Sequence, residues 1–367
     1  MKSLLKLKLK NIYFKIIKLI FDKIYGKLEV SNISFFSNEI KITNISLNKL
    51  SKKKYKIYSI PNARIYNDLK ENVAVIKEKK ILNEASIQLE DNHLKDVSYN
   101  KILKTGTRKL IQKKIHGNVL SLVQGFSAID NYGHWILDII PKLFIIEKYS
   151  NFENFDAIYL PNVKKKFQID SLKYFNINPK KYIDGSKFTH IYAENLTVPQ
   201  HPYWQLNKYQ METVANIDPD VINYLKNKFL KINNNFQGKK LFIDRSDSKY
   251  FHSQIENIDE LYKLFKSYDF EILKLTNFSF QEQISLFNNA KIVVGAHGAG
   301  LCNLIFCRSK TKVIEISNKE FKCDLFKNIS KFNNLEYHKL VSISDVPKNR
   351  INPDIKVSIE DLSRLIK

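Results

Sequence analysis

Glycine, cysteine and arginine are all scarce in this chain of 367 residues, which contains 10 Gly, 3 Cys and six Arg. The cysteines are Cys302, Cys307 and Cys323, and they provide neither a disulfide framework nor the paired spacing of a metal site. We therefore expect small buried cysteines, no bound metal and a reducing cytosol around the protein.

The N-terminal stretch lacks an uninterrupted apolar run. In "MKSLLKLKLKNIYFKIIKLIFDKIYGKLEV" lysines break every apolar segment, and no small-residue cleavage site follows. The stretch is therefore too charged to span a bilayer and does not read as a signal peptide. Its composition predicts a basic amphipathic helix over residues 1–29. Such a helix can lie on an anionic membrane surface or pack on its own domain, and the sequence favours neither.

Acidic residues are few: 37 Asp and Glu stand against 60 Lys and Arg, a formal net charge of +23. A basic surface favours phosphate-rich partners such as nucleic acid, anionic lipid or nucleotide-linked substrates. Arginine, on which readers of bases and phosphates depend, is scarce, and no RNP, KH or helix-turn-helix signature occurs. We expect no nucleic acid as partner, although a basic nucleic-acid-binding protein remains an alternative.

The pattern of apolar residues predicts an α/β protein of more than one domain. Short strand patterns without recognisable chemistry occupy the stretch from Val30 to about Leu120. Strand and helix patterns then alternate, with Pro141 expected to kink a helix or to start a new one. The alternation restarts after a polar connection as a Rossmann-like half. We expect an N-terminal domain over 30–210, a C-terminal nucleotide-binding domain over 211–350 and a terminal helix over 351–367.

Three of the few glycines cluster in "KIVVGAHGAGLCNLIFC", where Gly295, Gly298 and Gly300 surround His297. An apolar strand ends at this turn and a helix is expected to follow, so the turn lies at the carboxyl end of a parallel strand. Glycines let main-chain N–H groups approach an anion at a helix N-terminus, which predicts a cradle for a diphosphate. The spacing is neither G-x-G-x-x-G nor Walker A. Tight strand–helix packing with His297 as a cap is the alternative.

Two further elements of the same half carry residues suited to a nucleotide. Arg245 and Lys249 follow the strand of "LFIDRSDSKYF" and can bind phosphate, unless Arg245 only pairs with Asp247. Glu315 in "VIEIS" can accept hydrogen bonds from a ribose diol, or can face outward from an edge strand.

The first half contains one pair with catalytic spacing, His134 and Asp138 in "DNYGHWILD". Residues four apart share one face of a helix. Asp138 can then orient the imidazole as a general base, whereas a capping and packing role for a half-buried histidine is the alternative.

Together these segments resemble the catalytic domain of glycosyltransferase family 61, whose bacterial members are often capsular polysaccharide biosynthesis proteins. The resemblance rests on "NYGHWILDIIPKL", "YLP", "LTVP", "KLFIDRSDSKYF", "SFQEQISLFNNAKIVVGAHGAGLCNLIF" and "TKVIEI", in the family's order between Gly117 and Ser317. It implies two Rossmann-like domains facing a cleft, the glycosyltransferase B-type fold. It also implies a nucleotide-sugar donor, commonly a UDP-sugar, and inverting transfer without a metal or other cofactor.

The resemblance makes His134 and Asp138 the expected catalytic residues. The expected nucleotide-sugar-binding residues are Arg245, Lys249, Gly295, His297, Gly298, Ala299, Gly300, Leu301 and Glu315. Two positions depart from the family pattern: Lys142 and His252 stand where arginines are usual. A catalytically inactive scaffold therefore remains a further alternative.

The expected activity is sugar transfer to a glycan or lipid-linked oligosaccharide acceptor during synthesis of bacterial capsule or lipopolysaccharide. The basic N-terminus would suit a cytoplasmic protein held peripherally on the inner membrane.

Overall fold

The computed structural model describes residues 2–47, 53–68, 72–107, 109–123, 130–230, 236–247, 254–319, 321–344 and 354–367. The chain forms two compact units, and each is described by itself below. Unit 1 comprises residues 1–164 and 176–213, and unit 2 comprises residues 165–175 and 214–367. The segment 165–175 therefore belongs to unit 2 although it lies between two stretches of unit 1.

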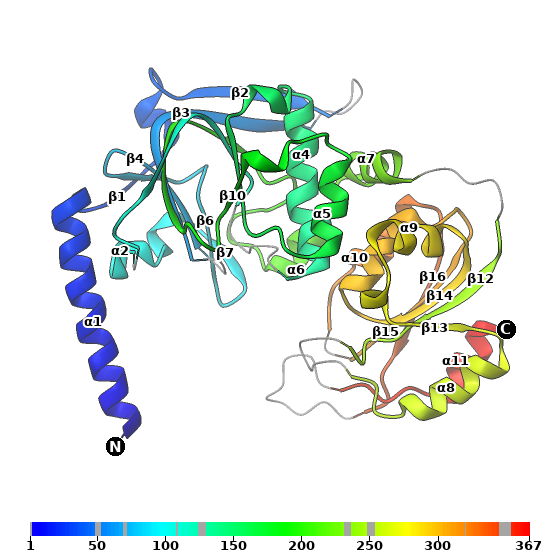
Figure 1. Ribbon diagram of the computed structural model, residues 1–367. Helices are drawn as coiled ribbons and strands as arrows, with labels where there is room; N and C mark the ends of the chain where they lie inside the picture. Colours follow the sequence, from blue (N-terminus) through cyan, green and yellow to red (C-terminus); the bar gives the residue numbers. More distant parts are fainter. Residues whose placement is uncertain are drawn as a thin grey trace. The chain divides into compact units, whose positions relative to one another are not determined.

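Unit 1 is built on an 11-stranded mixed sheet (Figure 1). Its main path runs β1-β5-β4-β3-β11-β8-β9-β10, with β2, β6 and β7 attached beside it. Strands β8, β9, β10 and β11 are parallel, whereas β3 is antiparallel to β11, β2 and β4. The strands are β1 (Glu29–Ser31), β2 (Lys41–Ser46), β3 (Lys54–Asn67), β4 (Asn72–Lys77), β5 (Lys80–Leu82), β6 (Ile87–Glu90), β7 (His93–Lys95), β8 (Lys113–Ser121), β9 (Ala157–Leu160), β10 (Tyr182–Asp184) and β11 (His190–Pro199).

The α-helices of unit 1 include one long helix at the N-terminus and several short ones. The N-terminal helix α1 forms as predicted, and in Figure 1 it extends away from the sheet. The α-helices are α1 (Lys2–Tyr25), α2 (Ile102–Thr105), α3 (Tyr132–His134), α4 (Ile140–Glu147) and α6 (Gln210–Ala215), the last of which crosses into unit 2.

Unit 2 is a Rossmann-like α/β unit with a five-stranded sheet in the order β13-β12-β14-β15-β16, in which every pairing is parallel. The strands are β12 (Lys239–Ile243), β13 (Glu271–Leu273), β14 (Ala290–Ala296), β15 (Lys312–Ser317) and β16 (Glu336–Val341). The helices are α5 (Lys166–Lys173), α7 (Pro219–Phe229), α8 (Ile258–Ser267), α9 (Phe280–Asn288), the 3₁₀ helix η7 (Ala299–Phe306), α10 (Leu325–Phe332) and α11 (Ile359–Ile366).

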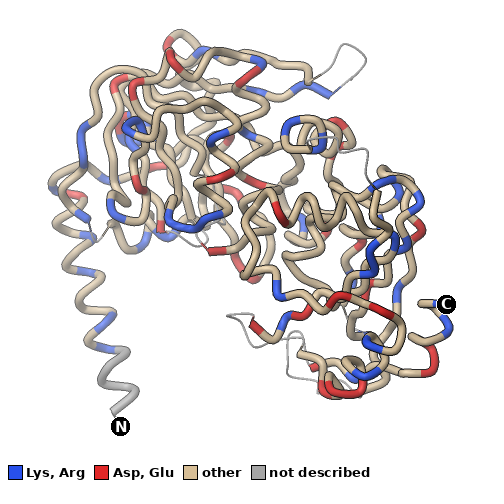
Figure 2. Tube along the Cα trace, turned by 45° about the vertical axis from the view of Figure 1, so that its right-hand side comes forward, with Lys and Arg blue, Asp and Glu red and all other residues tan. Residues whose placement is uncertain are grey.

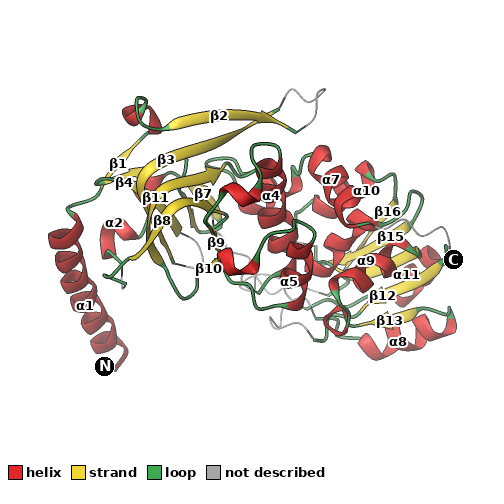
Figure 3. Cartoon of the chain, turned by 45° about the horizontal axis from the view of Figure 1, so that its top comes forward, coloured by secondary structure: helices red, strands yellow, loops and turns green. Residues whose placement is uncertain are grey.

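Alternate residues of β14 pack against helices on opposite faces of the sheet. Ile292 and Val294 share a buried cluster with residues of α8 and α11. Gly295, on the other face, lies against Leu301 of η7. Figure 3 shows α8 and α9 on different sides of this sheet. Helices on both faces explain why β14 is apolar almost throughout, as expected for a central parallel strand.

The expected α/β class is confirmed, and the parallel sheet of unit 2 has the predicted strands. Unit 1 differs from a Rossmann-like domain because antiparallel strands continue its parallel part. The helix expected after the glycine turn is 3₁₀ in form. Asn303 donates its side-chain amide to the Gly300 carbonyl at 3.1 Å, a group that an α-helix would bond to the next turn. The three cysteines are free and buried, as expected.

Candidate active site

The predicted catalytic histidine lies at an irregular point of a helix in unit 1. His134 ends α3, residues Trp135–Ile139 form a π-helical turn, and α4 begins at Ile140. Pro141 has no N–H to donate to the preceding turn, and the wider π turn accommodates the missing bond. The Asn131 side chain caps the start by accepting a hydrogen bond from the His134 N–H at 3.2 Å. The predicted break at Pro141 is therefore confirmed.

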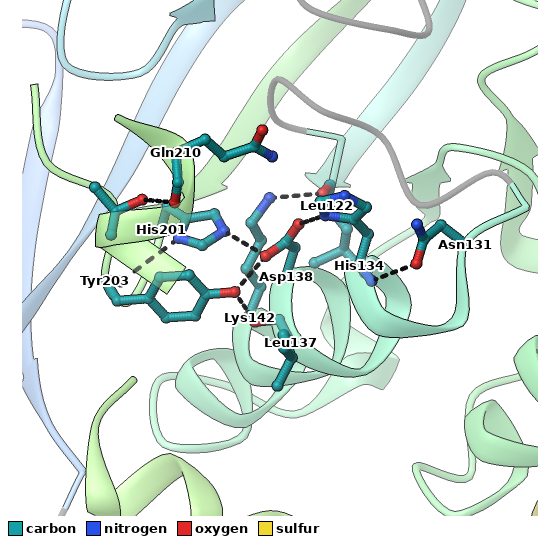
Figure 4. Close-up of polar contacts among 10 residues, drawn as sticks. Leu122, Asn131, His134, Leu137, Asp138, Lys142, His201, Tyr203 and Gln210 are labelled. Carbon is teal, nitrogen blue, oxygen red and sulfur yellow. Dashed lines mark hydrogen bonds and ion pairs between the residues drawn. The ribbon is translucent and has the colours of Figure 1, made fainter. Parts of the chain in front are cut away.

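The His134 and Asp138 side chains meet as their spacing predicts (Figure 4). Nδ1 of His134 lies 2.7 Å from Oδ2 of Asp138. The carboxylate is buried, whereas 21% of the His134 side chain is exposed. A carboxylate accepts, so Nδ1 carries the proton and the neutral imidazole has its lone pair on Nε2. The dyad is thus arranged to take a proton from a group that reaches Nε2.

Two residues that sequence reasoning missed complete the surroundings of Asp138 (Figure 4). The Tyr203 hydroxyl donates to Oδ1, and Nε2 of His201 lies 3.3 Å from the same oxygen. The buried His201 ring stacks on Trp204 with 4.1 Å between ring centroids. The segment "HPYW" carried the only signal, an apolar, aromatic stretch after β11 in a region interpreted as a polar connection.

Burial and hydrogen bonding act in opposite directions on this cluster. Burial alone would raise the pKa of Asp138, but the interactions of its carboxylate with His134 and His201 outweigh burial and leave the pKa well below its ordinary value. Burial lowers the pKa of His201 to about 4, against the opposing effect of Asp138. Asp138 is therefore ionised and His201 neutral near pH 7.

Lys142, the first departure from the family pattern, is fully buried beneath this cluster. Its Nζ donates to the Leu122 carbonyl at 2.9 Å (Figure 4). Burial lowers its pKa to about 7, with nearby Asp138 opposing the shift. The amine thus links α4 to the end of β8 and is not exposed to a substrate.

Unit 2 contains a second histidine–carboxylate pair at the glycine turn. Nδ1 of His297 lies 2.5 Å from Oε1 of Glu315, and the Tyr337 hydroxyl donates to Oε2 at 2.7 Å. The Glu315 side chain is fully buried, whereas His297 is half-buried. Both carboxylate oxygens are therefore engaged inside the protein. Glu315 is thus a partner of His297, and its expected hydrogen bonds to a ribose diol stay a prediction.

The glycines of the turn have different surroundings. A Cβ on Gly295 would lie 3.2 Å from Ile243 and from Leu301, and one on Gly300 would lie 2.8 Å from Leu275. Gly295 and Leu301 are buried in the packing of η7 on the sheet, and their expected contacts with the donor stay a prediction. The half-buried residues that remain at the turn are His297, Gly298, Ala299 and Gly300.

Gly298 has no Cβ and so leaves room for the side chain of Arg245. A Cβ there would lie 2.6 Å from Cζ of Arg245. The Gly298 backbone is extended, so close approach rather than dihedral freedom makes glycine necessary. Nη1 of Arg245 donates to the His297 carbonyl, and burial lowers the pKa of the guanidinium. The structure thus brings Arg245 to the turn, as the sequence predicted.

A small cavity of about 50 Å³ lies at the carboxyl ends of β12 and β14, between Arg245, Gln254 and Ala296. Nε2 of Gln254 is buried and has no hydrogen-bond partner among the residues that the structure describes. This amide is a third polar group that sequence reasoning missed. Lys249 and His252, both expected near here, lie outside the described residues.

Comparisons with known proteins agree with the motifs. The family model for Glycosyltransferase 61 matches residues 132–314. This range includes His134, Asp138 and His297 and ends one residue before Glu315. The chain is 31% identical over 93 residues to Beta-1,2-xylosyltransferase of Arabidopsis thaliana. This matched segment covers 25% of this chain and 16% of that protein. The chain is also 40% identical over 60 residues to Beta-1,2-xylosyltransferase RCN11 of Oryza sativa subsp. japonica. This segment covers 16% of this chain and 11% of that protein. The chain thus spans less than a fifth of either relative.

A solved structure, the dodecameric iron-containing heptosyltransferase TibC in complex with ADP-D-beta-D-heptose, matches with a TM-score of 0.28 and 11% identity. The match covers 74% of this chain and 78% of that one, and at this TM-score it supports no argument about the present fold. The sequence motifs and the family model define the class of protein, that of glycosyltransferases. Within it, the chain belongs to the glycosyltransferase 61 family.

Proposed function

We propose that this protein is an inverting, metal-independent glycosyltransferase that moves a sugar from a UDP-sugar to a hydroxyl of a glycan acceptor. The observation that carries the proposal is the half-buried imidazole of His134, held by buried Asp138 in a chain of this family. The names of both plant relatives refer to sugar transfer, which supports the same reaction class.

The acid–base step is assigned to His134. Nε2 takes the proton of the acceptor hydroxyl while that oxygen attacks the anomeric carbon from the face opposite to the diphosphate. The new C–O bond forms as the bond to the diphosphate oxygen breaks, so the configuration inverts. Asp138 stabilises the imidazolium that forms, and a positioned general base contributes about 10²–10⁴-fold in rate.

The leaving nucleoside diphosphate is assigned to the turn of unit 2. Arg245 and the half-buried stretch from His297 to Gly300 supply fixed donors at the carboxyl edge of a parallel sheet. The unpartnered amide of Gln254 adds a donor beside Arg245. Ligands of open α/β sheets bind at this edge, which supports the assignment.

We further propose an acceptor from bacterial capsule or lipopolysaccharide synthesis, such as a lipid-linked oligosaccharide. The net charge of +23 supports an acceptor or donor that carries phosphate.

The proposal is tested by thermal unfolding of the full chain with a panel of nucleotide sugars, including xylose donors because of the relatives' names. A ligand that binds the folded state raises the midpoint, by mass action. The stabilising donor is then assayed for transfer with a mixture of glycan acceptors, with and without EDTA. We expect a UDP-sugar to stabilise the protein and transfer to continue in EDTA.

Activity abolished by EDTA and restored by a divalent cation would overturn the metal-independent mechanism. Stabilisation by no nucleotide sugar, together with salt-sensitive binding to nucleic acid, would favour a basic nucleic-acid-binding protein instead. Binding of a donor without transfer to any acceptor would favour an inactive scaffold.

A further inference from the structure

The described side chains of helix α1 form two apolar stripes, an inner one packed against unit 1 and an outer one that is largely exposed. The inner stripe follows helical spacing through Phe14, Ile17, Phe21 and Tyr25. Phe21 is fully buried, and its side chain fills the space above Gly106, where a Cβ would lie 2.9 Å from it. The Tyr25 hydroxyl donates to the Leu110 carbonyl. The C-terminal part of α1 is therefore anchored to unit 1.

The outer stripe is exposed to water. Its members recur three and four residues apart, which places them along one side of the helix. They are Leu9 (57% exposed), Ile12 (55%), Tyr13 (47%), Ile16 (51%), Leu19 (70%), Ile20 (40%) and Ile24 (56%). Single exposed apolar residues are ordinary, but a continuous stripe of this length marks a binding surface.

The charge of α1 is almost entirely positive. The helix contains seven lysines and one acidic residue, Asp22, which pairs with Lys18. Lys8, Lys10, Lys15 and Lys23 are exposed beside the outer stripe, and Figure 2 shows blue segments recurring along the described part of the helix. Among the described residues, no helix is long and apolar enough to cross a membrane.

We propose that α1 binds the surface of an anionic lipid bilayer. The outer stripe enters the boundary between headgroups and acyl chains, and the flanking lysines contact lipid phosphates. A second copy of this chain fits the same stripe poorly, because pairing two such helices would bring two sets of seven lysines together with one aspartate each. An anionic surface neutralises those charges. This inference does not depend on the proposed sugar transfer.

The test is flotation of the full-length protein with phosphatidylcholine vesicles, with and without phosphatidylglycerol. The wild type is expected to float with the anionic vesicles, to remain behind with the neutral ones, and to bind less as salt is added. The double variant Ile16→Gln/Leu19→Gln is expected to lose at least about tenfold in partitioning, since it removes two apolar side chains from the boundary. The triple variant Lys8→Gln/Lys10→Gln/Lys15→Gln is expected to lose about 100-fold.

Ile111→Gln is the matched control, because Ile111 is 90% exposed but lies outside α1. It should float like the wild type. Thermal unfolding of each variant verifies the fold, and the inner stripe is left intact for that reason. Equal binding of wild type to neutral vesicles, or full binding by the Ile16→Gln/Leu19→Gln variant, would refute the proposal. A wild-type dimer in sedimentation that this variant converts to monomer would show that a second copy occupies the stripe.

Discussion

Both units hold a histidine in one orientation, but the chain brings the contacting residues together differently in each. Each fixes Nδ1 of a half-buried histidine with a buried carboxylate that also accepts a hydrogen bond from a tyrosine hydroxyl. The two triplets are His134, Asp138 and Tyr203 in unit 1, and His297, Glu315 and Tyr337 in unit 2. A histidine oriented in this way has a defined tautomer, with the proton on Nδ1.

The triplets differ in how the chain brings the histidine and the carboxylate together. His134 and Asp138 are one helical turn apart, so their contact is local. Glu315 lies on β15 opposite Gly295 of β14, and His297 follows Gly295 by two positions, so the register of β15 on β14 brings the two side chains together. The local pair could be predicted from spacing, whereas the non-local pair depends on strand register.

The surroundings of the carboxylates also differ. Asp138 has a second imidazole, His201, within 3.3 Å, and buried Lys142 near it. His297 instead has the rings of Phe321 and Phe326 with centroids at 4.1 and 4.8 Å. This difference agrees with the proposed roles, proton transfer in unit 1 and nucleotide binding in unit 2.

The largest expected effect separates these roles. His134→Ala should lower kcat by about 10²–10⁴-fold, because the general base is lost, while the thermal stabilisation by UDP is unchanged. His116→Ala is the matched control, since His116 also contacts a carboxylate, Glu194, at 2.6 Å but is 82% exposed. Loss of UDP binding in His134→Ala with transfer intact would reverse the assignment of the two units.

The next effect concerns stability against acid. The pKa of His201 is about 4 in the folded protein and ordinarily 6.5, so the unfolded chain takes up its proton first. The free energy of unfolding should therefore fall as the pH is lowered from about 6.5 to about 4, by about 3 kcal/mol from this group. His201→Gln should remove that part of the slope in urea unfolding measured at several pH values.

His190 provides an internal comparison, because burial lowers its pKa to about 4 as well. His190→Gln should remove a similar part of the slope, and the double variant should remove both parts. A slope between pH 6.5 and 4 that is as steep in the double variant as in the wild type would contradict the prediction.

A smaller effect tests the glycine turn. Gly298→Ala should displace Arg245 and weaken UDP binding about 10–100-fold, the range expected for a charged hydrogen bond. In an Arg245→Ala background the same substitution should cost little, because the clash is gone. Calorimetric titration of UDP into the four proteins of this cycle measures the coupling. Additive losses would show that the glycine serves another purpose.

The smallest effect compares the tyrosines. Tyr203→Phe and Tyr337→Phe each remove one hydrogen bond to a buried carboxylate. Such a loss corresponds to a change of about tenfold in the affected kinetic constant. We expect Tyr203→Phe to lower kcat and Tyr337→Phe to raise KM for the nucleotide sugar. Steady-state kinetics with varied donor distinguishes the two, and the same kinetic change in both variants would remove the proposed difference between the triplets.

Short-range patterns in the sequence were sufficient to predict several helix starts and part of the candidate site. Asp218 before Pro219 and the capping box of Ser279 and Glu282 mark helix starts that the structure contains. The spacing of His134 and Asp138 predicted their contact, and the proximity of Arg245 to the glycine turn followed from parallel strands ending at one edge.

Other features had no local signal. The antiparallel strands of unit 1 were recognised as short strands, but their union with the parallel part in one sheet was not. His201 and Tyr203 follow a different strand from the one that precedes His134, so only the pairing of β11 with β8 brings them to Asp138. The sequence also could not show that packing against η7 would bury Gly295 and Leu301.

The amino-acid sequence by itself determined the α/β class, most elements of unit 2, the basic N-terminal helix and the histidine–aspartate pair. Each of these depends on interactions between residues a few positions apart. The tertiary structure alone decided which buried groups complete the two triplets. Tyr337 lies opposite Val313, and so on the same face of the sheet as Glu315, only because of the register of β16 on β15. Strand order and register are set by the packing of the whole unit, which no short segment encodes.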